Sequence, residues 1–223
     1  MTILCIETST SVCSAAICKD GVPVKQCINL EGSNHARLLP LYIEELLSFA
    51  REQGLSIEAV ALSEGPGSYT GLRIGASTAK GLCYGLNLPL IPVPTLEVLC
   101  EATKEQSAIS NQQSAIPVPM IDARRMEVYT LVNGETKAVV VENEASLYAG
   151  TEEVYYFGDG AEKCAKVFTK PNWHYVPGIV PEAQYVGALA EQNTHSKSVD
   201  LAYYEPYYLK EFIAAQSHVK GLK

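Results

Sequence analysis

The chain has 223 residues, 47% of them hydrophobic, and a formal net charge of −8. This length suits one large domain or two small ones with a packed core. The acidic balance and the absence of a basic run disfavour tight, direct binding of nucleic acid by this chain alone. No apolar run approaches the roughly 18–20 residues that a membrane helix needs, so we expect a soluble protein without membrane contact.

The sequence start, MTILCIETSTS, predicts a buried strand and lacks the pattern of an export signal, which favours a cytoplasmic location. The seven cysteines lie mostly in apolar segments and include no Cys-x-x-Cys pair. We therefore expect small buried side chains in a reducing compartment, and no zinc site. They are Cys5, Cys13, Cys18, Cys27, Cys83, Cys100 and Cys164.

Three strands are expected first, over residues 2–7, 12–18 and 22–30, with Asp20-Gly21 as a hairpin turn between the second and third. Helices and strands are then expected to alternate, because segments with a helical hydrophobic period alternate with short apolar runs typical of buried strands. The expected elements are a helix over 33–53, a strand over 57–64, a helix over 71–86, a strand over 89–93 and a helix over 95–103. Ser33 or Asn34 can cap the first helix, and Thr70 the second.

The polar segment 104–115 is expected to be a linker, which divides the chain into a first domain over 1–107 and a shorter second domain over 108–223. The second domain begins with strands and has a hairpin turn at Asn133-Gly134. The expected elements are strands over 116–122, 126–132 and 136–142, a strand, glycine turn and helix over 153–164, a helix over 183–192 and an aromatic tail over 203–213. Three strands before the first helix is not the dinucleotide-binding order, so the fold predicted is a two-lobed α/β fold.

The segment GPGSYTGLRIG, residues 65–75, carries a strand into a helix. It lacks the Gly-Lys-Ser/Thr ending of a Walker A loop, and its glycine spacing fits a dinucleotide fingerprint poorly. Two interpretations stay open. Gly71, Gly75 and Ala79 recur every four residues and can let another helix approach, while Gly65, Gly67 and Ser68 can present backbone amides to an anion.

Polar residues follow the first strand, at 7–11 (ETSTS). Thr8 and Ser9 in this turn can hold phosphates, as in actin-like ATPases, or can simply form a polar β-turn. His35 opens the first helix, but the position four residues later is Leu39, so a metal pair is not expected there. Asp122 and the arginines at 124 and 125 are expected to form a structural ion pair. No nucleophile–base pair is apparent, and no catalytic residue is predicted.

Three segments together resemble the TsaB family, also called YeaZ: ILCIETSTSVCSAAI at the start, GPGSYTGLRIG at 65–75 and IDARRMEVY at 121–129. The resemblance spans essentially the whole chain. It implies the ASKHA (actin/Hsp70-like, ribonuclease H-like) α/β fold, with two lobes and mixed sheets flanked by helices. It also implies a role in forming N6-threonylcarbamoyladenosine (t6A) at position 37 of tRNAs that read ANN codons.

In that pathway the resemblance implies a non-catalytic scaffold for the TsaD transferase, joined by the TsaE ATPase, with tRNA bound only through the complex. The chain would pair with TsaD, or with itself when the partner is absent, through the first two helices of the first lobe. No cofactor is expected on this chain alone, and ATP or ADP is allowed only at the interface of the complex. The departures here (a lone His35, Glu7 in place of aspartate, a short second lobe) favour this role over the alternatives. Those alternatives are a stand-alone ASKHA nucleotide hydrolase or kinase and a glycoprotease-type metallopeptidase.

The interface implied by the resemblance lies on the helices at 34–53 and 71–86, with some of its candidate residues facing the core instead. The candidates are Leu38, Leu39, Tyr42, Leu46, Gly71, Gly75 and Ala79. Gly75→Leu is expected to abolish association with the transferase while leaving the chain folded.

Overall fold

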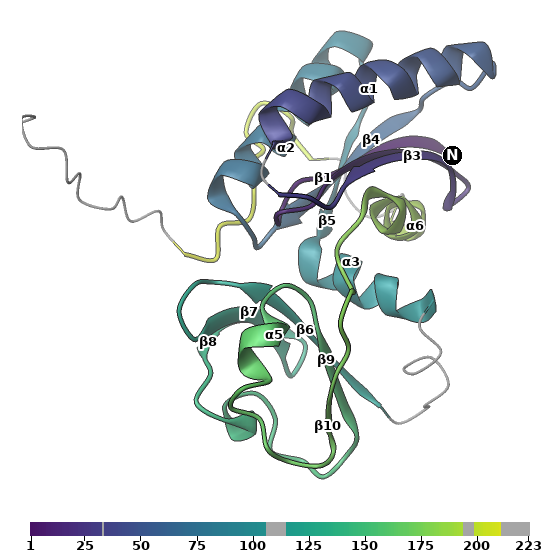
Figure 1. Cartoon of the computed structure of the whole chain (residues 1–223). Helices are drawn as coiled ribbons and strands as arrows, with labels where there is room; N and C mark the ends of the chain where they lie inside the picture. Colours follow the sequence, from purple (N-terminus) through teal and green to yellow (C-terminus); the bar gives the residue numbers. More distant parts are fainter. Residues whose placement is uncertain (33, 106–114, 194–198, 211–223) are drawn as a thin grey trace, which may run out of the picture.

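The computed structural model describes residues 1–32, 34–105, 115–193 and 199–210. These residues form two α/β lobes, each built on one five-stranded sheet, and the two lobes lie one above the other in Figure 1. The predicted two lobes with mixed sheets flanked by helices are therefore confirmed. The domain boundary at 107/108 lies outside the described residues.

The first lobe follows the predicted order of elements. They are β1 (Thr2–Glu7), β2 (Cys13–Lys19), β3 (Val22–Asn29), α1 (His35–Glu52), β4 (Ala59–Gly65), α2 (Tyr69–Leu86), β5 (Leu90–Pro94), α3 (Thr95–Ala102) and the 3-10 turn η1 (Thr103–Glu105). The strand order in the sheet is β3-β2-β1-β4-β5. β1, β2 and β3 are antiparallel neighbours, while β4 runs parallel to β1 and β5 parallel to β4.

The second lobe repeats this arrangement. Its elements are β6 (Ile116–Asp122), β7 (Glu127–Val132), β8 (Glu135–Val140), the 3-10 turn η2 (Glu144–Ser146), β9 (Val154–Phe157), α5 (Ala161–Cys164), β10 (Trp173–Tyr175) and α6 (Ala183–Asn193). The order β10-β9-β6-β7-β8 is that of the first sheet read from the other edge, with the same parallel and antiparallel pairings. β10 was not predicted from the sequence.

Helices α1 and α2 cover one face of the first sheet (Figure 1). In α1 the buried apolar residues Leu39, Ile43, Leu46 and Ala50 recur every three or four positions, so one stripe of the helix reaches the core. The predicted caps need correction. Asn34 makes no side-chain capping bond within the described residues, and Ser33 lies outside them. Ser68, not Thr70, caps α2 by accepting from the backbone N–H of Gly71.

The last helix of each lobe packs between the two sheets (Figure 1). α6 comes from the second half of the chain, yet its Ala183, Val186 and Ala190 pack on the first sheet. α3 comes from the first half, and its Leu96 and Leu99 join a cluster with residues of the second sheet. This exchange gives five layers in the order α1 and α2, first sheet, α6 and α3, second sheet, α5.

The tail at 199–210 returns to the first lobe. The backbone N–H of Tyr207 donates to the carbonyl oxygen of Glu64 at 2.7 Å, and Lys80 donates to the carbonyl oxygen of the buried Tyr204 at 3.1 Å. The part of the predicted aromatic tail at 211–213 lies outside the described residues. Among the described residues, no helix combines the length and apolarity needed to cross a bilayer.

Candidate functional site

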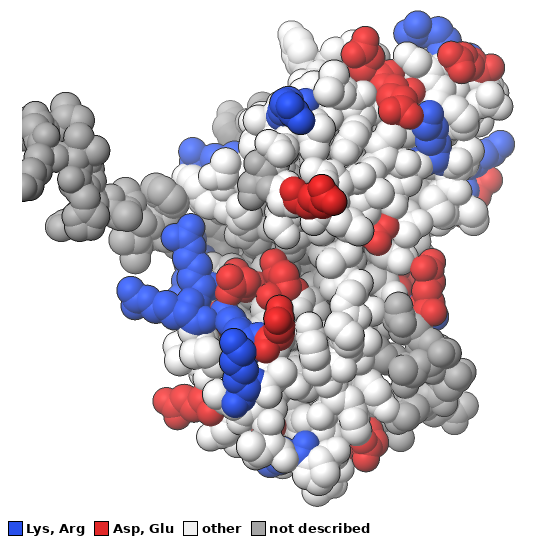
Figure 2. Space-filling view, viewed as in Figure 1, with Lys and Arg blue, Asp and Glu red and all other residues white. Residues whose placement is uncertain are grey.

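A cleft with a volume of about 1510 Å³ lies between the lobes. It is lined by the β1–β2 turn, the start of α1, the β4–α2 turn with the first turns of α2, the β6–β7 turn and the tail at 207–210, together with Val140 of β8 and Asp159 of the β9–α5 turn. In Figure 2 Lys and Arg side chains gather at the rim between the lobes, beside a group of Asp and Glu side chains. Pockets for small ligands usually measure about 300–1,000 Å³, so this cleft has room for one.

The β1–β2 turn is closed by the buried carboxylate of Glu7. Its Oε1 accepts from the backbone N–H of Ser9 at 2.5 Å and from the Ser9 hydroxyl at 2.6 Å. Burial raises the pKa of Glu7, and hydrogen bonding by Ser63 and Ser9 opposes that rise. Glu7 therefore holds its own turn together, and it does not extend into the cleft.

The glycine-rich β4–α2 turn packs directly against the β1–β2 turn. The backbone N–H of Ser68 donates to the Ser9 carbonyl oxygen at 2.6 Å, and the Thr8 hydroxyl donates to the Gly71 carbonyl oxygen at 2.9 Å. A Cβ added at Gly67 would meet Ser9, and a Cβ at Gly71 would meet the Thr8 carbonyl. The glycines are therefore explained by a close approach of two turns within the first lobe.

The structure brings all five predicted anion contacts, namely Thr8, Ser9, Gly65, Gly67 and Ser68, to this junction of two turns. The Thr8 and Ser9 hydroxyls and the Ser68 amide and hydroxyl already have protein partners. Gly65 has a φ of +119°, a conformation open to glycine, and lies against the carbonyl of Tyr207. Anion contact by these residues stays a prediction.

The seven predicted interface residues divide into two groups. Five are buried in the first lobe, namely Leu39, Leu46, Gly71, Gly75 and Ala79, and two are partly buried, namely Leu38 and Tyr42. A Cβ at Gly75 would meet the Thr8 hydroxyl and Leu62, so the structure contradicts the expectation that Gly75→Leu leaves the fold intact.

The outward face of α2 was missed. It carries Ser77, Gly81 and Gly85, a second series of small residues at four-residue spacing, all exposed. Next to it Tyr84 is 86% exposed, and Leu41 of α1 is 55% exposed. Spacing alone cannot distinguish this series from Gly71, Gly75 and Ala79, because both have the same period.

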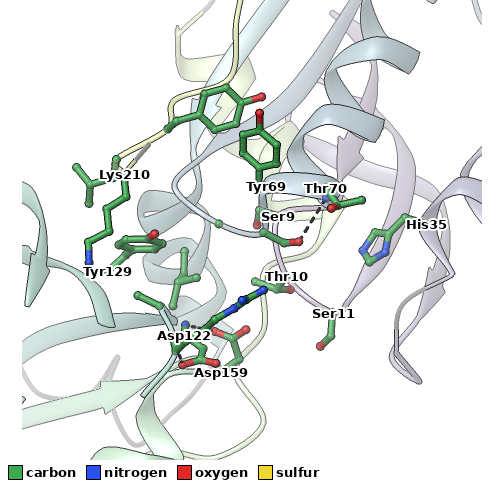
Figure 3. A pocket seen from close by; sticks show the side chains of 18 of the residues that line it. Ser9, Thr10, Ser11, His35, Tyr69, Thr70, Asp122, Tyr129, Asp159 and Lys210 are labelled. Atoms are coloured by element: carbon green, nitrogen blue, oxygen red, sulfur yellow. Dashed lines mark hydrogen bonds between the residues drawn. The ribbon is translucent and has the colours of Figure 1, made fainter. Parts of the chain in front are cut away.

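The β6–β7 turn enters the cleft from the second lobe. Asp122 accepts from the backbone N–H of Arg124 at 3.0 Å and pairs with Lys163, so the predicted Arg–Asp side-chain pair is wrong. The backbone N–H of Asp122 donates to Asp159 at 2.9 Å, and desolvation is the main cause that raises the pKa of Asp159. In Figure 3 Asp122 and Asp159 lie across the opening from the β1–β2 turn.

His35 lies on the wall of the first lobe. Its Nε2 is 3.0 Å from the carbonyl oxygen of Val12; a carbonyl can only accept, so this ring nitrogen donates. Leu39, one helical turn later, is fully buried. Within residues 1–32, 34–105, 115–193 and 199–210, no three His, Cys, Asp or Glu side chains are grouped as a metal site would require.

Two lobes with one repeated strand order, exchanged terminal helices and a cleft between them define an ASKHA-type protein. A solved structure of YeaZ from Pseudomonas aeruginosa has the same fold, with a TM-score of 0.73 and 25% identity, over 93% of this chain and 99% of that chain.

The model of the TsaD family, described as tRNA N6-adenosine threonylcarbamoyltransferase, matches residues 29–203. TsaB of Haemophilus influenzae, a tRNA threonylcarbamoyladenosine biosynthesis protein, is 36% identical over 129 residues, which is 58% of this chain and 52% of that protein. TsaB of Escherichia coli is 37% identical over 130 residues, which is 53% of that protein. The chain therefore spans about half the length of the curated relatives that it matches. The chain belongs to the TsaB (YeaZ) branch of this family.

Proposed function

We propose that this chain is a non-catalytic subunit required to form t6A at position 37 of tRNAs that read ANN codons. It binds and activates a TsaD-type transferase in the cytoplasm, together with a TsaE-type ATPase, and tRNA reaches it through the complex. In the absence of the transferase the same surface pairs two copies of the chain. The names of the relatives support the pathway, since they are tRNA threonylcarbamoyladenosine biosynthesis proteins.

The outward face of α1 and α2 carries this proposal. A groove runs between the two helices, lined by residues from both, among them Pro40, Leu47, Ser77 and Gly81. Exposed apolar side chains of Leu41 and Tyr84 lie on the same two helices. A helical surface that combines a groove with exposed apolar side chains suits the packing of helices from a partner.

Gly81 and Gly85 give a second reason to place the partner there. A Cβ at either position would meet nothing within 4 Å among the described residues, so packing inside the chain does not require glycine. Glycine inside an exposed helix costs about 0.8–1 kcal/mol relative to alanine. Two glycines at exposed positions of one helix are therefore explained by their small size, because small residues allow another helix to approach closely.

Gly81→Leu tests this surface. The substitution fills the outward face without touching the core, so the chain should fold normally while co-purification with the TsaD-type transferase falls by at least about tenfold. Glu52→Leu is the matched control, because it adds the same side chain at an exposed position of α1 outside the groove. If Gly81→Leu forms the complex as well as the wild type does, the partner does not bind the outward face of α1 and α2.

The pathway is tested separately by depleting the protein in its host and measuring t6A in bulk tRNA by mass spectrometry. The expected result is a large loss of t6A, restored by the wild-type chain and by Glu52→Leu but not by Gly81→Leu. Normal t6A after depletion would contradict the proposed function, whatever the interface experiment shows.

A further inference from the structure

Two cysteines lie close together under α6. Cys5 of β1 and Cys18 of β2 both belong to the cluster between the first sheet and α6, and both are fully buried. In the antiparallel register Cys18 lies opposite Ile3, two residues before Cys5, so the two cysteines are diagonal neighbours on adjacent strands. The Cys5 thiol donates to the carbonyl oxygen of Ile3 at 3.6 Å, which turns its sulfur toward Cys18.

Gly187 of α6 lies directly over both sulfur atoms. A Cβ added at this glycine would clash with Cys18 Sγ and would lie 3.0 Å from Cys5 Sγ, so a single point on the helix is next to both thiols. Glycine inside a helix weakens the helix, and here the close approach to the two sulfurs accounts for it. The first lobe therefore holds a pair of thiols directly beneath a helix.

The docked helix keeps this pair of thiols unreactive. The pKa of the Cys5 thiol is raised well above its ordinary value, first by burial and then by its contact with the Cys18 thiol. The thiolate is the form that attacks a disulfide, so a buried thiol with a raised pKa reacts slowly. Reaction at these sulfurs therefore requires α6 to leave the sheet.

Small side chains hold α6 on the first sheet. Its apolar residues buried there are Ala183, Val186 and Ala190. On the opposite face of the same sheet α1 buries larger side chains, including Leu39 and Leu46. Apolar stabilisation grows with the area buried, and local opening occurs where few apolar contacts hold an element. We therefore expect α6 to leave the sheet more readily than the sheet itself unfolds.

We propose that Cys5 and Cys18 form a modification site, which closes into a Cys5–Cys18 disulfide when α6 leaves the sheet and a low-molecular-weight disulfide reaches the pair. One cysteine thiolate attacks the reagent, displaces one of its sulfurs as a thiol and forms a mixed disulfide. The second cysteine thiolate attacks the cysteine sulfur of that mixed disulfide and displaces the other half of the reagent. Each cysteine loses one proton, and the reagent is reduced to two thiols. The proposal does not depend on the proposed function.

The test exposes the folded full chain to oxidised glutathione. The remaining thiols are then blocked with an alkylating reagent under denaturing conditions, and the peptides are mapped by mass spectrometry. Cleavage after Glu7 and Lys19 separates the peptide 1–7, which holds Cys5, from the peptide 8–19. The expected product is a disulfide that links these two peptides.

Two variants identify the partner of Cys5, because the peptide 8–19 holds both Cys13 and Cys18. Cys18→Ala should abolish the link. Cys13→Ala is the matched control and should keep it, since Cys13 belongs to the cluster on the opposite face of the sheet, under α1. A link that persists in Cys18→Ala, or that disappears in Cys13→Ala, would overturn the proposed pair.

The role of α6 is tested by the rate at which the link forms in native buffer. Val186→Ala removes an apolar contact between α6 and the sheet, so the link should form at least about tenfold faster than in the wild type. Ile43→Ala is the matched control, because it removes a buried side chain from the opposite face without touching α6. It should change the rate far less.

Two results would overturn the proposal. The first is a wild-type chain that forms no link between the peptides 1–7 and 8–19 in native buffer, while the denatured chain does. The second is an equal acceleration by Ile43→Ala and Val186→Ala, because the thiols would then become accessible through unfolding of the whole lobe and not through movement of α6.

Discussion

The two lobes share one strand order but differ in what covers their outer faces. In the first lobe the crossovers β3–β4 and β4–β5 are made by α1 and α2, each of 18 residues. In the second lobe the corresponding crossovers carry η2, with three residues, and α5, with four. Strand pairing alone therefore does not require the long helices of the first lobe, and this difference leaves an extended helical surface on one lobe.

The second lobe replaces the missing helices with aromatic packing. Phe168 and Trp173 have ring centroids 4.8 Å apart, and both rings contact Tyr156. Tyr175 stacks on the same tyrosine at 5.6 Å. Aromatic side chains bury a large area each, so a few of them can close a face that the first lobe covers with two helices.

Trp173→Ala should have the largest effect of the substitutions that test this comparison. It removes a buried ring that packs on both Tyr156 and Phe168, and truncation of a buried tryptophan costs about 3–5 kcal/mol. The free energy of unfolding from urea titration measures the loss. Trp173→Phe is the control, since it keeps a ring in place and should cost far less. Equal stability of Trp173→Ala and the wild type would show that the second lobe does not depend on this cluster.

Gly75→Leu and Gly81→Leu compare the two faces of α2 in the first lobe. Gly75→Leu forces a side chain onto Thr8 and Leu62, and overpacking of this kind costs about 1–3 kcal/mol or more. Gly81→Leu has open space and should gain up to about 0.8 kcal/mol from helix propensity. Urea midpoints that shift in opposite directions are expected. A wild-type midpoint for Gly75→Leu would refute the packing of α2 on the β1–β2 turn.

Glu7→Gln should have a smaller effect, visible in its pH dependence. The folded-state pKa of Glu7 is raised above its ordinary value, so between those two values the folded chain holds more protons than the unfolded chain. The free energy of unfolding should therefore fall as pH rises through that window. The glutamine side chain can still accept from Ser9 and has no proton to lose, so the substitution should remove the fall.

Urea titrations between about pH 4 and pH 7 measure this dependence. Asp122 provides the matched control, because it ends β6 as Glu7 ends β1 but is exposed and paired with Lys163. Asp122→Asn should keep the fall that Glu7→Gln removes. Persistence of the fall in Glu7→Gln would show that another group causes it.

Most of the first lobe could be predicted because its signals are local. Asp20-Gly21 marks a hairpin through a conformation that few other residues tolerate, as Asn133-Gly134 does in the second lobe, and α1 has a clear apolar period. β10 could not be found in the same way, since Trp173–Tyr175 has three residues and no alternation to detect. Its place depends on parallel pairing with β9, a contact between segments distant in the sequence.

The candidate site was harder to predict than the fold for the same reason. The sequence identified the glycine turn but could not show that Gly67 and Gly71 face the β1–β2 turn, about 60 residues earlier in the chain. It placed Asp122 beside arginines, while the partner in the structure, Lys163, comes from α5. Ion pairs between distant segments decide which charged side chains stay unpaired, and the spacing of residues along one segment does not reveal these pairs.

The exchange of α3 and α6 also sets an order of events during synthesis. The strands of the first sheet are complete at Pro94, but α6, which covers one of their faces, ends at Asn193. A ribosome adds about 5–20 residues each second, so the part of this apolar face that α6 covers stays exposed for roughly 5–20 s. During that interval Ile3, Val93 and their neighbours on the nascent first lobe are accessible to a chaperone or to a second copy of the chain.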